Sequence, residues 1–339
     1  MYKEEEVIFN NGNIRLAGTL TIPNKDGKHP AVVMITGSGP LNRDEEYMGM
    51  KPFKIIADHF TKKGIAVLRY DSRGVGGSTG NVFLSTFPNF ASDVMAAIKF
   101  LKNRNEINHS QIGLCGHSEG AFIAPLCAST SEEVAFVILI SGGGHNGEKL
   151  FLAQSELIMG ADGDSEDKIN DILISQKKLL KLILEEAKEK EIESILIDIT
   201  KKSMNIETDL EETSKEELDP TVKNQVTCQL EQFNSPWFKY FLEYDPIQKL
   251  EKVKCPVLML FGELDLQVPT KLNKDAMVGA LKKGDNKHYS FKIFPKANHL
   301  YQRAKTGSPS EYGELAKEFV PGFLEFMSNW LVKYVTIIK

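Results

Sequence analysis

The chain has 339 residues, of which 42% are hydrophobic and 26% are charged, a composition typical of a soluble globular protein whose core needs no disulfide or metal cross-links. Its net charge of -5 argues against a nucleic-acid-binding surface, which needs an excess of basic residues. The acidic N-terminus lacks the apolar stretch of a signal peptide, and no segment reaches the roughly 18 apolar residues of a membrane span. The four cysteines form no CxxC pair. We therefore expect a cytoplasmic protein with free thiols, no metal or other cofactor and no membrane partner.

The first part of the chain alternates predicted strands with predicted helices. Residues 5–22 alternate apolar and polar side chains around Asn11-Gly12, which predicts an antiparallel hairpin. The expected buried strands that follow are 31–36, 65–70, 111–115 and 134–140, and the expected helices are 53–63, 92–101 beginning at Ser92 and Asp93, and 121–129. This order predicts an α/β fold with a mostly parallel sheet and helices on both faces.

A charged helical segment then interrupts the alternation. Two amphipathic runs, 169–187 and 192–199, carry Glu and Lys on their outer sides. We predict a core domain of 1–144 and 246–339 and a helical insertion of 145–245. Its apolar side chains either line a substrate pocket or pack as core: Phe151, Leu152, Leu157, Ile158, Met159, Trp237, Phe238, Tyr240 and Phe241. The sheet pattern resumes with strands at 256–261 and 289–294 and helices at 272–281 and 312–332.

The motif Gly116-His117-Ser118-Glu119-Gly120 fits G-x-S-x-G, between a predicted strand and a predicted helix. A sharp strand-to-helix turn makes one hydroxyl project, and glycines two residues before and after it leave room for that turn. Amides at the helix N-terminus can then stabilise negative charge. We predict that Ser118 is a nucleophile.

A serine nucleophile needs a base and a carboxylate that orients the base, which in this arrangement follow in the order Ser, acid, His. Of seven histidines, His299 is the best candidate, because it lies in a loop directly after the last predicted strand. Asp265, which follows the strand at 256–261, is the preferred acid, with Glu263 as its competitor. His117 lies within the turn itself, where it cannot easily serve as the base. The expected oxyanion donors are the backbone N–H groups of Glu119 and of Ser38, in the loop after the strand at 31–36.

Several segments resemble bacterial α/β-hydrolases of the esterase and acyl-hydrolase type. They are 69–78 (D-x-R-G-x-G-x-S), 36–44 (a G-S-G-P-x-x-R-D oxyanion loop found in one esterase branch), 261–269 (F-G-x-x-D-x-x-V-P) and 298–300 (N-H-L). The resemblance implies an α/β-hydrolase fold and a carboxylic-ester hydrolase whose insertion forms a cap. It also implies a catalytic triad of Ser118, Asp265 and His299 and an oxyanion hole formed by Ser38 and Glu119.

The oxyanion loop departs from many relatives at one position, because Thr36 stands where they carry histidine. In the same loop, Arg43 and Asp44 are expected either to form an internal ion pair or to make an exposed pair worth under about 1 kcal/mol.

These features predict a serine hydrolase that cleaves an ester through an acyl-enzyme. A thioesterase, amidase or small-peptide hydrolase remains an alternative on the same fold, and a non-catalytic ligand-binding homologue is an alternative of another class. A haloalkane dehalogenase is disfavoured, since it would need aspartate at position 118. The expected partner is a small-molecule acyl ester, with no nucleic acid and, at most, a second copy of the chain in a homodimer.

Overall fold

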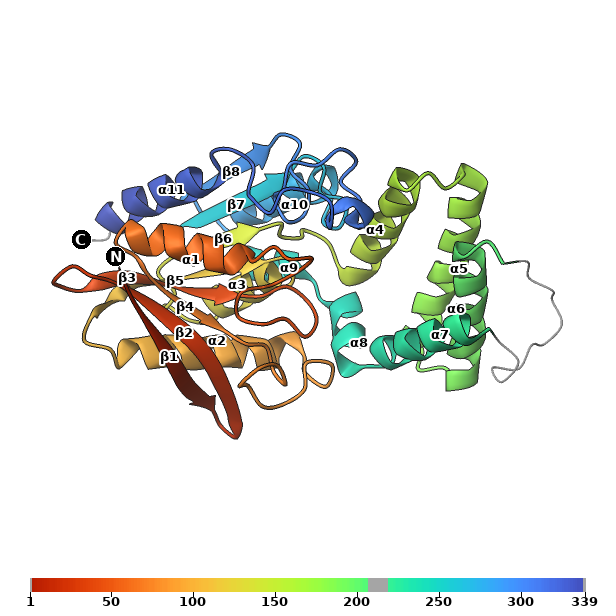
Figure 1. Cartoon of the computed structure of the whole chain (residues 1–339), viewed down its shortest axis with the longest axis horizontal. Coiled ribbons are helices and arrows are strands. Elements are labelled where there is room, and N and C mark those ends of the chain that lie inside the picture. Colours follow the sequence, from red (N-terminus) through yellow and green to blue (C-terminus); the bar gives the residue numbers. More distant parts are fainter. Residues whose placement is uncertain (1, 207–218, 338–339) are drawn as a thin grey trace. The chain divides into compact units, whose positions relative to one another are not determined.

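The computed structural model describes residues 2–206 and 219–337, and the chain divides into two compact units. One comprises Met1–His145 together with Asp245–Lys339, and the other comprises Asn146–Tyr244. Part of the predicted insertion, residues 207–218, lies outside the described residues. Figure 1 traces the elements of both units along the chain.

Within the described residues, the first unit is built on an eight-stranded sheet in the order β1-β2-β4-β3-β5-β6-β7-β8 (Figure 1). The strands are β1 (Tyr2–Asn11), β2 (Ile14–Pro23), β3 (His29–Ile35), β4 (Ala66–Tyr70), β5 (Ile107–His117), β6 (Val137–Ile140), β7 (Val257–Gly262) and β8 (Tyr289–Phe294). β1 pairs with β2, and β2 with β4, in antiparallel fashion, and every other neighbouring pair is parallel. The predicted hairpin and the mostly parallel sheet are both confirmed.

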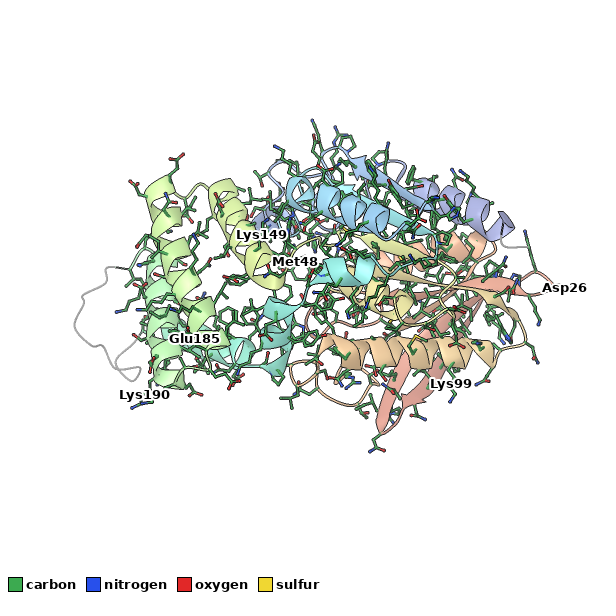
Figure 2. All side chains as sticks on the ribbon, turned by 180° about the vertical axis from the view of Figure 1, so that it is seen from behind. Asp26, Met48, Lys99, Lys149, Glu185 and Lys190 are labelled. Atoms are coloured by element: carbon green, nitrogen blue, oxygen red, sulfur yellow. The ribbon has the colours of Figure 1, made fainter. Side chains whose placement is uncertain are left out.

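Helices cover both faces of this sheet. On one face, α1 (Pro52–Lys62) and α11 (Phe323–Ile337) pack Phe53, Phe60 and Trp330 into one core with the strands. The opposite face carries α2 (Phe87–Lys102), α3 (Gly120–Ala128), α9 (Pro246–Leu250) and α10 (Thr270–Lys283). Figure 2 views this face, with Lys99 on the exposed side of α2. The buried aliphatic strands between two helical layers account for the parallel arrangement.

The second unit is helical throughout its described residues, with α4 (Gly147–Ala161), α5 (Glu166–Leu184), α6 (Glu189–Ser203), α7 (Pro220–Phe233) and α8 (Pro236–Glu243). The Phe151 ring packs against Phe233 and Phe238 within this unit, and Trp237 stacks on Phe241. These aromatic side chains at the two ends of the insertion therefore form core inside the unit. Charged side chains such as Glu185 and Lys190 project from its outer surface (Figure 2).

The predicted start of one helix is wrong, because α2 begins at Phe87 and not at Ser92. The Asn89 side chain accepts a hydrogen bond from the Thr86 backbone N–H at 2.8 Å and so caps the helix one turn earlier. Asp93 lies inside the helix, where it is buried and bonded to Arg73 instead of capping.

The predicted start of the last helix is also wrong, since α11 begins at Phe323 and not at Tyr312. Gly322 has a φ of +81°, and Pro321 precedes it, so the backbone cannot remain helical through this pair. Residues 309–311 form a single 3₁₀ turn, and the fully buried Tyr312 follows it.

Gly113 gives a test of packing in the central strand. A Cβ at Gly113 of β5 would lie 2.2 Å from the Phe136 ring, so Gly113→Ala should lower the free energy of unfolding by about 1–3 kcal/mol, the usual cost of overpacking. Gly279→Ala is the matched control: Gly279 lies on α10 with nothing within 4 Å, and alanine there should stabilise by up to about 1 kcal/mol. Thermal denaturation of both variants measures the difference, and equal midpoints would contradict this packing.

Candidate active site

Ser118 lies in the turn between β5 and α3 that the sequence predicts. Its φ of +53° is in the left-handed region, which costs of order 1–3 kcal/mol for a residue other than glycine unless the surroundings hold it. Two hydrogen bonds do so: Ser118 N–H donates to the Ile140 carbonyl of β6, and Ala121 N–H donates to the Ser118 carbonyl, each at 2.9 Å. The neighbouring strand therefore fixes the serine at the end of the sheet.

The two motif glycines are required by close backbone approach. A Cβ on Gly116 would lie 2.1 Å from the Gly120 carbonyl oxygen, and a Cβ on Gly120 would lie 2.1 Å from the Ile35 carbonyl oxygen. Both distances are far inside van der Waals contact, and the obstructing atoms belong to the backbone. Only glycine at both positions allows β3, β5 and α3 to meet at the serine.

Asp265 and His299 come together from the loops that follow β7 and β8. His299 Nδ1 lies 3.0 Å from both carboxylate oxygens of Asp265, and both side chains are buried. The carboxylate also accepts the N–H groups of Gln267 and Val268, at 3.0 and 2.8 Å. Since Nδ1 faces the carboxylate and carries the proton, Nε2 is the ring nitrogen left to accept one.

The charge of Asp265 is held by these partners. Burial alone would raise the pKa of its carboxyl, but His299, the Ser141 hydroxyl and the Val268 N–H outweigh burial and lower the pKa below its ordinary value. The competing acid, Glu263, is exposed and accepts the Lys296 N–H at 2.8 Å. The geometry thus brings Asp265, and not Glu263, to His299.

A cavity of about 170 Å³ brings the candidate residues together. Its walls come from the oxyanion loop, the Ser118 turn and the loops after β7 and β8, all within the first unit. They are Gly37, Ser38, Leu41, Glu45, Tyr47, His117, Ser118, Gln267, His299, Leu300, Pro309 and Tyr312. Ser118 and His299 therefore face one space of small-molecule size.

One expected oxyanion donor, Ser38, lies in the loop that approaches Ser118, and the other, Glu119, directly follows Ser118 in the chain. Ser38 is exposed in the loop after β3 and lines the cavity, directly after Gly37, whose ideal Cβ position is 3.4 Å from the Ser118 Cβ. Glu119 is the N-cap of α3, so its amide is among those at the helix N-terminus, where the helix dipole favours negative charge.

The expected ion pair between Arg43 and Asp44 is wrong, because each residue pairs with a different partner. Arg43 donates from Nε and Nη2 to Asp71 at 3.1 and 2.8 Å, and Asp44 pairs with Arg69 of β4. Side chains of adjacent residues point apart, which explains why they do not meet. Both pairs are partly or wholly buried and attach the oxyanion loop to the sheet.

The segment that begins at Asp71 binds this loop through hydrogen bonds. Besides the Arg43 side chain, Asp71 accepts the N–H groups of Arg43 and Gly77 at 2.9 and 3.3 Å. Burial would raise the pKa of the Asp71 carboxyl, but the Arg43 guanidinium outweighs it and lowers that pKa. Thr36, which stands where many relatives carry histidine, shares a 3.1 Å hydroxyl–hydroxyl hydrogen bond with Ser72.

Beside the nucleophile lie Glu45, which the sequence did not indicate, and His117, which it offered only as an unsuitable base. Glu45 is 3% exposed, and its Oε1 accepts from the Gly37 N–H at 2.6 Å and from His117 Nδ1 at 3.1 Å. His117 Nε2 lies 3.0 Å from the His299 carbonyl oxygen. Sequence position rightly made His117 a poor base, because both ring nitrogens are occupied. The only sequence feature that pointed to Glu45 was its position as the third charged residue in a row, after Arg43 and Asp44.

Among residues 2–206 and 219–337, no three His, Cys, Asp or Glu side chains gather as a metal site would require. None of the described helices combines the length and the apolar character needed to cross a membrane.

The chain is similar to several known hydrolases. Residues 49–303 match the family described as serine aminopeptidase, S33, a hydrolase family. The chain belongs to the S33 serine aminopeptidase family. This S33 protein is 27% identical to Esterase EstD of Thermotoga maritima over 338 residues, which is 97% of this chain and 68% of the relative. Family and relative together support a carboxylic-ester hydrolase.

Solved structures confirm the α/β-hydrolase fold of this S33 protein. An esterase from Pyrococcus furiosus superposes with a TM-score of 0.59 at 16% identity, covering 99% of this chain and 91% of the other. Est1E from Butyrivibrio proteoclasticus, solved with ferulic acid bound, superposes with a TM-score of 0.53 at 17% identity and covers 98% of both chains.

Arg43 allows a test of the loop attachment in this S33 protein. Arg43→Met leaves the Asp71 carboxylate, whose side chain is 4% exposed, without its cation, so the free energy of unfolding at pH 7 should fall by about 3 kcal/mol. The lowered pKa of Asp71 means that its charge stabilises the fold above pH 3.8 and that this contribution is lost as the pH falls through the folded pKa. The difference between wild type and variant, measured by urea denaturation, should therefore shrink below pH 3.8.

Lys62→Met is the matched control, because it removes the cation of an exposed pair with Asp58. We expect a loss under about 0.5 kcal/mol. Equal effects of the two substitutions would contradict a buried anchoring role for Arg43.

Proposed function

We propose that this protein hydrolyses carboxylic esters, with Ser118 as nucleophile, His299 as general base and Asp265 as the carboxylate that orients it. One observation carries the proposal: Ser118, held in a strained turn, lines the same cavity as His299, whose Nδ1 is 3.0 Å from the buried Asp265 carboxylate. A strained serine and a buried acid–histidine pair facing one space is the arrangement that acyl transfer requires.

The proposed reaction proceeds in two halves. His299 Nε2 takes the proton of the Ser118 hydroxyl while Oγ attacks the ester carbonyl, and the N–H groups of Ser38 and Glu119 stabilise the resulting oxyanion. Asp265 keeps the Nδ1–H tautomer and stabilises the imidazolium. His299 then returns its proton to the departing alcohol oxygen, which leaves the acyl group on Ser118. Water then loses a proton to His299 and attacks the acyl carbonyl. The bond to Ser118 Oγ breaks, His299 returns the proton to Oγ, and the carboxylic acid leaves.

The substrate is proposed to be a small-molecule acyl ester. Leu41, Leu300, Tyr47 and Tyr312 give the cavity apolar and aromatic wall, which suits an acyl group. The esterase relative and the bound ferulic acid of Est1E support an ester of a carboxylic acid. We also propose that the helical unit selects among such esters. The cytoplasm is the proposed location.

Hydrolysis of an amide or small peptide is the second candidate, which the family's description as a serine aminopeptidase favours. The same acyl-enzyme would form, with His299 protonating an amine instead of an alcohol. Comparing kcat/KM for p-nitrophenyl esters and aminoacyl p-nitroanilides separates the two candidates. We expect the ester to be cleaved with the higher value, and a higher value for the anilide would favour the peptidase.

Substitution of the nucleophile gives the direct test. Ser118→Ala should lose activity on a short-chain p-nitrophenyl ester by about 10⁴-fold or more, because no acyl-enzyme can form. Labelling with a fluorophosphonate probe should disappear in the same variant. Ser110→Ala, an exposed serine at the start of β5, is the matched control and should retain both activity and labelling. A folded Ser118→Ala protein with wild-type activity excludes the proposed nucleophile.

The choice between the two acids has its own test. Asp265→Asn should lower kcat by about 10⁴-fold, because the amide favours the wrong tautomer of His299. Glu263→Gln changes a carboxylate that only accepts the Lys296 N–H and should leave kcat within about twofold. Steady-state kinetics on one ester measures both, and the reverse ranking would assign the acid to Glu263.

A further inference from the structure

Glu45 and His117 form a buried pair that the proposed reaction does not use. We infer that Glu45 is a positioning residue that acts through His117 to hold the oxyanion loop and the His299 loop against the Ser118 turn. The inference rests on the proposed function, since it concerns the alignment of the same three groups. Neither side chain is assigned a role at the reacting atoms.

The first link runs from Glu45 to the oxyanion loop. Glu45 Oε1 accepts the Gly37 N–H at 2.6 Å, and Gly37 directly precedes Ser38, the proposed oxyanion donor. Because the Gly37 N–H is directed at the carboxylate, the peptide between Thr36 and Gly37 has a fixed orientation, one peptide before the one that carries the Ser38 N–H. The other carboxylate oxygen, Oε2, is buried with no hydrogen-bond partner among the described residues, so the carboxylate serves these contacts through one oxygen.

The second link runs from Glu45 through the imidazole of His117 to the loop that carries the base. Nδ1 lies 3.1 Å from Glu45 Oε1, and Nε2 lies 3.0 Å from the His299 carbonyl oxygen. Both partners accept hydrogen bonds only, so both ring nitrogens must carry protons for both bonds to exist. His117 is therefore an imidazolium paired with the Glu45 carboxylate, adjacent in sequence to Ser118.

The charges around His117 agree with this state. Burial would lower the pKa of His117, but Glu45, the His299 carbonyl and the more distant Asp265 carboxylate outweigh burial and raise the pKa above 6.5. The His299 ring packs 4.6 Å from the His117 ring, centroid to centroid. Both bonds are thus present below pH 6.5 and one is lost as the pH rises through the raised pKa of His117.

Glu45→Gln removes the negative charge of residue 45 and nearly preserves the shape of its side chain. One of three contacts is then lost. With the glutamine carbonyl on the Gly37 N–H, a neutral His117 has a single N–H and releases either residue 45 or the His299 carbonyl; with the glutamine NH₂ turned to His117 Nδ1, the Gly37 N–H loses its acceptor. We expect kcat on a p-nitrophenyl ester to fall by about 10- to 100-fold at a pH where His117 has lost its proton in the variant but keeps it in the wild type, short of the roughly 10²–10³ for loss of an oxyanion donor. KM should stay within about threefold, because no substrate contact is removed.

The pH profile distinguishes positioning from a general loss of stability. Without the carboxylate, His117 loses its proton at lower pH, so the ratio of wild-type to variant kcat should be near one at acidic pH and grow as the pH rises. His117→Asn should lower kcat similarly, and Glu45→Gln combined with His117→Asn should lose no more than His117→Asn alone. Glu46→Gln, which changes a partly exposed carboxylate paired with Lys51, is the matched control and should behave as wild type.

Wild-type kcat in Glu45→Gln, or a ratio that is constant across pH, overturns the inference. Ser118→Ala, assayed beside it, keeps the two proposals apart: activity in Ser118→Ala refutes the proposed function, whereas inactive Ser118→Ala with fully active Glu45→Gln refutes only the role of Glu45. If Glu45→Gln does not fold, ¹⁵N NMR of the wild-type His117 ring decides. Two protonated nitrogens at pH 6 support the pair, and a neutral ring contradicts it.

Discussion

The placement of Ser118 depends on three backbone segments that meet without side chains between them. The carbonyls of Ile35 and Gly120 occupy the positions that side chains on Gly120 and Gly116 would need. A left-handed serine is unfavourable by itself, so the sheet and the first turn of α3 must supply the energy that holds it. The geometry of the candidate site therefore depends on the packing of the buried strands. A change in that packing would move the Ser118 hydroxyl.

Residues 36–45, which include the proposed oxyanion loop, have no regular secondary structure in their central part. Ion pairs, and not backbone pairing, fix their conformation. Three consecutive residues reach three different places: Arg43 binds Asp71, Asp44 binds Arg69, and Glu45 binds His117. Buried ion pairs contribute little net stability, because desolvation offsets their attraction, but an alternative loop conformation would leave several buried charges unpaired. Such pairs select one conformation more strongly than they stabilise the fold.

The sequence was sufficient for features that depend on local pattern or chain order. Alternating strands and helices predicted the mostly parallel sheet, and the resemblance implied the α/β-hydrolase fold, which the solved structures confirm. The G-x-S-x-G motif predicted the strand–turn–helix at Ser118. Chain order singled out His299 among seven histidines, and the structure places it beside Asp265.

Features that depend on partners far apart along the chain were not predicted from the sequence. Glu45 and His117 are 72 residues apart, and no spacing rule joins them. Aspartate often caps helices, but Asp93 forms a buried ion pair with Arg73 instead. The preference of aspartate for the cap position was therefore misleading here. The start of α11 was placed too early, because the backbone preferences of Pro321 and Gly322 determine where the helix can begin.

The helical unit enters the chain between two strands that are direct neighbours in the sheet. β6 and β7 pair in parallel from Val137 opposite Val257 to Ile140 opposite Leu260, although a whole helical unit separates them in sequence. The entropy of closing such a connection rises only with the logarithm of its length. Evolution could thus lengthen, shorten or exchange this unit at small thermodynamic cost, while the strands that carry Ser118, Asp265 and His299 keep their register. The helical unit and the sheet that positions these three residues can in this way diverge at different rates.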